Sequence, residues 1–291
     1  MMFSRIVVFV VGAIIAHNLY ASDTVGPVWQ VSNGKQTLFV GGTIHVLSPS
    51  DYPLPKVFDQ AYQQADVLVF EADVSTMQTP EIQQLIIDKT QYKNGVTLKS
   101  TLAQKTYQRL QQFLQTRGSS VQSIEQFKPG MVTMILTLNE IQRLGQLGQG
   151  VDDFYHQLAL RDRKSTLFLE SIEQQITFLA TMGAGQEDDL LEYTLTELDN
   201  LDVQLAELKA AWRKGDNARL LHLGLTPWQE DFPSLYQSLL VQRNVAWLPQ
   251  LEAMLLTPEV EYVLVGALHL PGDDGVLSML RERGYQVKQL H

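Results

Sequence analysis

The 291-residue chain contains no cysteine. A disulfide framework, a thiol nucleophile and a lipoprotein anchor are therefore all excluded, and stability must come from a packed core. Basic residues are also scarce, because 22 Lys and Arg stand against 32 Asp and Glu, which gives a formal net charge of -10. Nucleic acids and anionic membrane surfaces are bound through clustered Lys and Arg, so we expect neither as a partner.

The N-terminus carries an apolar run, Ile6 to Ala16, that follows the single basic residue Arg5. A membrane-spanning helix needs about 20 apolar residues, and this run is well short of that length. Small residues follow it, a pattern typical of a secretory signal peptide over residues 1–21 with cleavage after Ala21. We therefore expect a periplasmic or secreted protein with no stable membrane anchor after signal cleavage. An exported protein that has no cysteine fits a bacterial periplasm best.

The composition, 45% hydrophobic and 19% charged, is that of an ordinary globular protein. After the signal, an Asn33-Gly34 turn predicts a hairpin whose second strand begins at Thr37. Helical spacing of apolar residues follows over 58–65, and the continuous apolar run 67–70 is typical of a buried parallel strand. The N-terminal half, about 28–80, is thus a strand, a helix and a strand.

The C-terminal half, about 244–291, repeats this plan. The segment EYVLVGALH predicts a strand, residues 276–283 a helix, and YQVKQL a closing strand. Between the halves, about 80–243, the pattern is mostly helical and forms an insertion. The prediction is one domain, 22–291, of the α/β class, in which two βαβ-containing halves form a central sheet and carry a large helical insertion.

Each half contains a glycine and, three residues later, a histidine: Gly42 with His45, and Gly266 with His269. Both pairs follow an expected strand, and parallel α/β sheets bind ligands at the carboxyl ends of their strands. A glycine at such a place lets the backbone turn sharply or approach a ligand closely. We therefore expect the two histidines to converge on one site.

Acidic residues supply a carboxylate that could join the two histidines in this site. Glu71 directly follows the strand 67–70, and strand alternation would point Asp73 the same way. Two imidazoles and one carboxylate form a ligand set for Mn, Co or Zn, and such an ion would activate water for hydrolysis. Other interpretations stay open, since each histidine could be structural, and Glu71 could cap a helix or pair with Arg243.

Five segments, in this order, are similar to those of the TraB/GumN family, which includes the TIKI proteins and the pheromone-shutdown proteins of conjugative plasmids. They are GTIHVL, VLVFEAD, GVDDFYHQLALRDRKSTLFLESIEQQ, QRNVAW and VGALHLPGDDGVLSMLRERGYQV. The resemblance implies a two-halved α/β fold with a helical insert and, as in the TIKI branch, metal-dependent protease activity. It places the family's two Gly-x-x-His motifs on His45 and His269 and its acidic residue on Glu71.

The resemblance also assigns further positions. The Arg-Asn pair falls on Arg243 and Asn244, the middle acidic residue on Asp152, and the Leu-Glu and Gln positions on Glu170 and Gln175. A guanidinium at 243 would bind a substrate carboxylate or the oxyanion formed during attack.

We therefore predict an exported metal-dependent hydrolase that cleaves a peptide or protein. His45 and His269 would hold the metal, and Glu71 would be either the third ligand or the general base. If Glu71 is a ligand, Asp152 or Glu170 becomes the base. The alternatives are a non-catalytic binding protein for a signalling peptide or small molecule, and an esterase-like hydrolase that has the same site with a different pocket.

Overall fold

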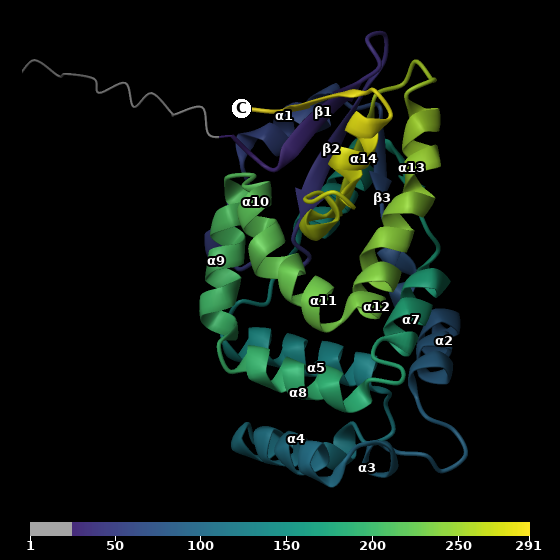
Figure 1. The fold of residues 1–291 in the computed structure, drawn as a ribbon. Coiled ribbons are helices and arrows are strands. Elements are labelled where there is room, and N and C mark those ends of the chain that lie inside the picture. The colour runs from purple at the N-terminus through teal and green to yellow at the C-terminus, as the bar shows by residue number, and fades with distance from the viewer. Residues whose placement is uncertain (1–24) are drawn as a thin grey trace, which may run out of the picture.

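The computed structural model describes residues 25–291. The predicted signal peptide, residues 1–21, lies outside this part of the chain. Within residues 25–291, every helix is too short or too polar to cross a bilayer. The predicted α/β class is confirmed, because helices pack around a central sheet (Figure 1).

The sheet has six strands in the order β4-β3-β5-β2-β1-β6. Their bounds are β1 Val28–Ser32, β2 Thr37–Thr43, β3 Val67–Phe70, β4 Ser165–Phe168, β5 Glu261–Gly266 and β6 Gln286–Gln289. The predicted hairpin is confirmed, since β1 and β2 pair antiparallel and Gly34 takes the positive φ that its turn requires. Strands β2, β5, β3 and β4 run parallel, so their carboxyl ends meet at one edge.

Strand β4 lies in the segment that was expected to be mostly helical. Its four residues alternate between exposed and half-buried, which is the pattern of an edge strand with one solvated face. It pairs with β3 from Val67↔Ser165 to Phe70↔Phe168. The insertion therefore contributes a strand to the sheet, and its chain passes directly by the end of β3.

The helices are α1 Lys56–Gln64, α2 Pro80–Thr90, α3 Leu98–Thr101, α4 Gln104–Thr116, α5 Pro129–Arg143, α6 Val151–Asp162, α7 Ile172–Thr181, α8 Glu187–Leu198, α9 Leu201–Arg213, α10 Asn217–Leu220, α11 Thr226–Asp231, α12 Pro233–Tyr236, α13 Gln242–Met254 and α14 Val276–Glu282. Short helical turns are η1 Pro49–Asp51, η2 Val74–Gln78, η3 Val121–Ser123, η4 Leu221–Leu225, η5 Gln237–Val241 and η6 Ala267–His269, of which η4 and η5 are π-helical.

Helices cover both faces of the sheet. On one face, Phe58 of α1, Tyr155 of α6 and Trp212 of α9 belong to one apolar cluster with strand residues such as Tyr262. On the other face, α13 and α14 pack against the alternate residues of the same strands. The alternation of side chains along each strand thus supplies two cores, one on either side.

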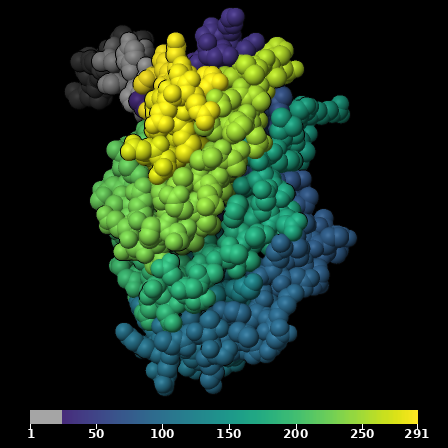
Figure 2. Space-filling model, turned by 45° about the vertical axis from the view of Figure 1, so that its right-hand side comes forward, coloured from purple at the N-terminus to yellow at the C-terminus, as the bar shows by residue number. Residues whose placement is uncertain are grey.

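Helices α3, α4, α5 and α8 form a second layer at one end of the molecule. Leu110, Val132 and Leu191, from α4, α5 and α8, share a separate apolar cluster. In Figure 1 these helices lie at the end away from the sheet, with α3 and α4 outermost. Figure 2 shows the same division, with the yellow C-terminal residues at one end and the blue segment near residue 100 at the other.

A buried ion pair ties this helical layer together. The Glu140 side chain is 3% exposed and accepts hydrogen bonds from Arg117 at 2.8 Å and Arg143 at 3.0 Å. Burial alone would raise its pKa, but the hydrogen bonds from Arg143 and Arg117 lower the pKa from 4.5 to about 2. The folded state therefore binds this proton more weakly than the unfolded chain does.

We expect Glu140→Gln to reduce the free energy of unfolding at neutral pH by up to about 3 kcal/mol. This value is an upper limit, because Arg143 is exposed and water weakens its interaction with Glu140. The stabilisation is present above the pKa that Glu140 has in the unfolded chain, and it disappears as pH falls through the lower pKa that Glu140 has in the folded protein. Urea unfolding of both proteins should therefore show a difference that shrinks between roughly pH 5 and pH 2. A difference that does not change with pH would contradict this account.

Candidate active site

Four parallel strand ends deliver the candidate residues to one edge of the sheet. His45 follows β2 by two residues, Glu71 directly follows β3, and Glu170 follows β4 by two residues. His269 ends the turn η6, which begins as β5 stops at Gly266. The expectation that each histidine stands just beyond a strand end is met, and the parallel register brings these ends together.

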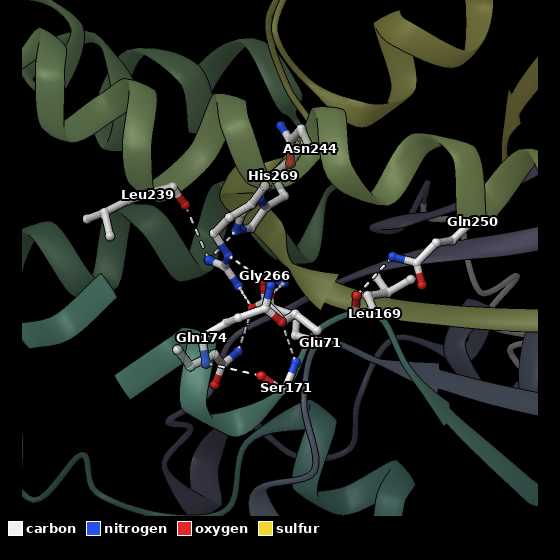
Figure 3. Close-up of polar contacts among 12 residues, drawn as sticks. Glu71, Leu169, Ser171, Gln174, Leu239, Asn244, Gln250, Gly266 and His269 are labelled. Atoms are coloured by element: carbon white, nitrogen blue, oxygen red, sulfur yellow. Dashed lines mark hydrogen bonds and ion pairs between the residues drawn. The ribbon is translucent and has the colours of Figure 1, made fainter. Parts of the chain in front are cut away.

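Glu71 occupies the centre of the site, and the residue is 9% exposed. Its Oε1 accepts a 2.7 Å hydrogen bond from the backbone N–H of Gly266. Its Oε2 accepts from Arg243 Nη2 at 2.5 Å and from Gln175 Nε2 at 3.2 Å. The pairing of Glu71 with Arg243, left open by the sequence, is therefore present. Figure 3 shows Glu71, Gly266 and His269 together, with Ser171 and Gln174 beside them.

Arg243, from α13, links the other members of the site. Its Nε donates to Glu170 at 3.1 Å, and its Nη2 contacts the same carboxylate, which is 4% exposed. Its Nη1 lies 3.1 Å from His269 Nε2 and donates to the Leu239 carbonyl at 3.2 Å. A fixed fork of donors thus joins two buried carboxylates to one imidazole.

The start of α7 sets Gln175 in place beside these carboxylates. Ser171 caps the helix, accepting from the N–H of Gln174 while the Gln174 side chain accepts from the N–H of Ser171. One residue further on, Gln175 donates to both Glu71 and Glu170. The cap therefore fixes where the helix begins and hence where Gln175 points.

His269 is buried, and its ring is oriented from behind. Its Nδ1 lies 2.6 Å from Asn244 Oδ1, and Trp247 packs against the ring with a centroid separation of 4.5 Å. The Nδ1 proton is therefore donated to the amide oxygen, which leaves the Nε2 lone pair facing Arg243. Burial, together with the neighbouring Arg243, outweighs the attraction of Glu71 and lowers the pKa of His269 to about 3. The imidazole is neutral at physiological pH.

His45 is oriented in a similar way, by a carboxylate in place of an amide. Its Nδ1 lies 3.1 Å from Asp152 Oδ2, and its side chain is 60% exposed. The backbone N–H of Val151 donates to the backbone carbonyl of Ile44. A Cβ on Gly150 would lie only 2.2 Å from the His45 carbonyl oxygen. The start of α6 can approach this closely because residue 150 is glycine. The Asp152 carboxylate raises the pKa of His45 above the ordinary value.

The three predicted metal ligands surround one point beside Gly266. A Cβ built there would lie 3.3 Å from Glu71 Oε1, 3.6 Å from His269 Cδ2 and 3.7 Å from His45 Nε2. The missing side chain of Gly266 therefore leaves open the space on which these groups converge. Glu71 stays ionised in that space, because the Arg243 guanidinium and the hydrogen bond from the Gly266 N–H outweigh the effect of burial and hold its pKa well below the ordinary value.

The donors match a divalent ion in chemical kind. Both histidines have Nδ1 held by an oxygen acceptor, which leaves Nε2 as the possible ligand atom, the arrangement that protein partners impose on metal-binding imidazoles. Arg243, however, takes up Glu71 Oε2 and His269 Nε2. Within residues 25–291, no three His, Asp or Glu side chains are placed so that they hold an ion as they stand. Metal binding and the Arg243 contacts therefore compete for the same atoms.

Several sequence-based expectations differ from the structure. Asp73 does not join Glu71, because β3 ends at Phe70 and the Asp73 carboxylate accepts from the Ser75 N–H at 3.1 Å at the start of η2. Gly42 does not face the site, since a Cβ there would lie 3.2 Å from Ala267 Cα. Its small size lets the end of β2 pack against η6.

The sequence pattern did not indicate one further histidine that lies near the site. His156 is buried, and its ring meets Phe70 edge-on at a centroid separation of 5.2 Å. It lines a cavity together with His45, Glu71 and Asp152. Its position four residues after Asp152, on the same face of α6, was the signal that could have found it.

Two cavities of about 340 Å³ each flank the site. His45, Glu71 and Gln175 line both, so these three side chains form the ridge between them. The cavity with His156 and Asp152 lies on the α6 side, and the other is bordered by α7, η4, α11 and η5. A substrate that crosses the ridge would place one part in each cavity.

Comparison with known proteins places the chain among relatives over almost its whole described length. The family model described as "TraB/PrgY/gumN family" matches residues 27–289. The "Uncharacterized protein YbaP" of Escherichia coli (strain K12) is 31% identical over 250 residues, which cover 85% of this chain and 89% of the relative. The protein of the same name from Shigella flexneri is 31% identical over 242 residues, 82% of this chain and 86% of the relative. No solved structure matches.

Proposed function

The chain belongs to the TraB/PrgY/gumN family, and from this premise we propose that it is an exported, metal-dependent hydrolase that cleaves a peptide or protein outside the cytoplasm. The observation that carries the proposal is the convergence of His45 Nε2, Glu71 and His269 beside Gly266. Two oriented imidazoles and an ionised carboxylate at the carboxyl ends of parallel strands form a donor set typical of hydrolytic sites.

In this proposal His45, Glu71 and His269 hold a divalent ion such as Mn, Co or Zn. The bound ion would supply Lewis-acid chemistry, lowering the pKa of a coordinated water and polarising a carbonyl. Asp152 and Asn244 act through the histidines, because each accepts from an Nδ1 proton and thereby fixes the ring. Removing either partner would loosen a histidine without removing a ligand.

The general base is a carboxylate on the ridge or beside it. If Glu71 serves as the base, it is ionised at neutral pH and can accept a proton, but its lowered pKa makes it a weak base. If Glu71 is a ligand, Asp152 or Glu170 takes that role. Asp152 Oδ1 is buried without a hydrogen-bond partner among the described residues, whereas Glu170 is engaged by Arg243 and Gln175. Asp152 is therefore the stronger second candidate.

Arg243 is the group that would stabilise negative charge on the substrate. A guanidinium released from Glu71 would offer donors to a substrate carboxylate or to the oxyanion formed during attack. Its Nε contact with Glu170 would keep the side chain in the site while the other nitrogens change partners. The contact between Trp247 and the guanidinium, 4.8 Å from the ring centroid, supports the same orientation.

A second function is favoured by one observation. Because Arg243 pairs with Glu71 and contacts His269 Nε2, two of the three donors already have a protein partner without a metal. Such a site fits a non-catalytic protein that binds a signalling peptide or small molecule in the same cavities. Binding would then need no ion and would survive the loss of His45.

The test is a cleavage screen with the mature protein. A mixture of synthetic peptides is incubated with Mn²⁺, Co²⁺ or Zn²⁺, and the products are identified by mass spectrometry. We expect cleavage that EDTA abolishes and that re-added metal restores. If no peptide is cut with any of the three ions while some peptides still bind, the binding-protein function replaces the hydrolase.

A further inference from the structure

The cavity on the α7 side of the ridge is apolar up to the edge of the candidate site. Its walls include Phe178, Trp228, Leu239 and Leu268, which are half-buried and face the space of about 340 Å³. His45, Glu71 and Arg243 stand at its boundary with the ridge. Ligand pockets typically combine such a mainly apolar lining with a few convergent polar groups.

Two irregular helical turns shape this cavity. Gly224 lies in the π-helical turn η4, and Leu239 lies in the π-helical turn η5, four residues before Arg243. π-Helical turns within helices are frequently found at functional sites. The same segment thus supplies an apolar wall through Leu239 and a charged group through Arg243.

We propose that this cavity binds a bulky apolar side chain of a peptide substrate, such as Phe or Leu, next to the bond that is cut. The inference rests on the proposed hydrolase function and deepens it by naming the substrate class. A peptide fits the arrangement because the ridge separates two cavities, so an extended chain can cross Glu71 with residues on both sides. The second cavity differs in character, because it adds the carboxylate of Asp152.

Gly224 offers a way to narrow the cavity. A Cβ at this position would lie 2.6 Å from Leu268 Cδ2, and both residues line the cavity, so a larger residue at 224 occupies space there and displaces the Leu268 side chain. Phe178→Ala acts in the opposite direction because it enlarges the cavity. Leu256→Ala serves as the control, since Leu256 is 80% exposed and stands after the end of α13.

The experiment measures binding separately from turnover. Four blocked hexapeptides that differ only in one central residue, Phe, Leu, Ala or Asp, are titrated by calorimetry into the Glu71→Gln protein. We expect the Phe and Leu peptides to bind at least about ten-fold more tightly than the Ala and Asp peptides. Gly224→Leu should remove this preference, Phe178→Ala should shift it from Leu towards Phe, and Leu256→Ala should leave it unchanged.

The apolar subsite and the hydrolase function can fail separately. Equal binding of all four peptides, or a preference that neither cavity variant changes, overturns the apolar subsite. Binding of dodecyl maltoside without binding of any peptide overturns it as well. If the Glu71→Gln protein shows the preference but the wild-type protein with metal cuts none of the peptides, the subsite stands and the hydrolase function fails.

Discussion

Glu71→Gln is expected to lower the rate of peptide cleavage by about 10³-fold while the fold is retained. The substitution keeps the shape of the side chain but removes the negative charge that faces His45, His269 and Arg243. A general base or an anionic ligand is lost in either case. Metal content of the variant separates the two roles, since an unchanged content identifies Glu71 as the base and a reduced content identifies it as a ligand.

Glu261→Gln is the matched control for this prediction. Glu261 is also a buried glutamate of the sheet, 4% exposed, but it stands at the start of β5, away from the strand end that carries the site. Burial raises its pKa, so an uncharged amide is well tolerated there. Equal losses of activity in the two variants would show that the Glu71 effect is structural, and the proposed role would be wrong.

Arg243→Gln is expected to reduce kcat by about 10²- to 10³-fold without weakening metal binding. The loss of activity follows from removing the donors that would face the developing negative charge. Metal affinity should hold or increase, because Arg243 no longer competes for Glu71 Oε2 and His269 Nε2. The measurements are kinetics on the folded fraction and a metal titration followed by calorimetry.

Stability will also fall, because Glu71 and Glu170 lose their shared cation while buried. Arg117→Gln controls for this effect, since Arg117 pairs with the buried Glu140 far from the site in the helical layer. The control should lose stability but keep full activity per folded molecule. If Arg243→Gln instead keeps its activity, or binds metal more weakly, Arg243 does not have the proposed role.

The strand ends of the site could be predicted from local pattern. The run 67–70 becomes β3 with the same bounds, and its end leaves Glu71 at the edge of the sheet. The two Gly-x-x-His motifs span the ends of β2 and β5, with each glycine still in the strand and each histidine beyond it, so strand length and parallel pairing suffice to bring His45 and His269 together. Short-range signals of this kind are strong because each depends on only a few neighbouring residues.

The contacts between distant segments could not be predicted from pattern alone. Strand β4 has only four residues, half of them exposed, and a helical context on both sides conceals it. The position of Arg243 between two carboxylates and His269 depends on how α13 packs across the sheet, which helical periodicity does not determine. The apolar cavity depends in the same way on the π-helical turns η4 and η5.

The most direct test of the proposed metal site is metal content, measured by plasma mass spectrometry on mature protein purified without chelators. A His45→Ala, His269→Ala double variant is measured beside it, with His291→Ala as a control because His291 is exposed at the C-terminus. We predict near-stoichiometric Mn, Co or Zn in the wild-type and control proteins and none in a folded double variant. Wild-type protein that is metal-free and binds none of these ions when they are added back would contradict the account.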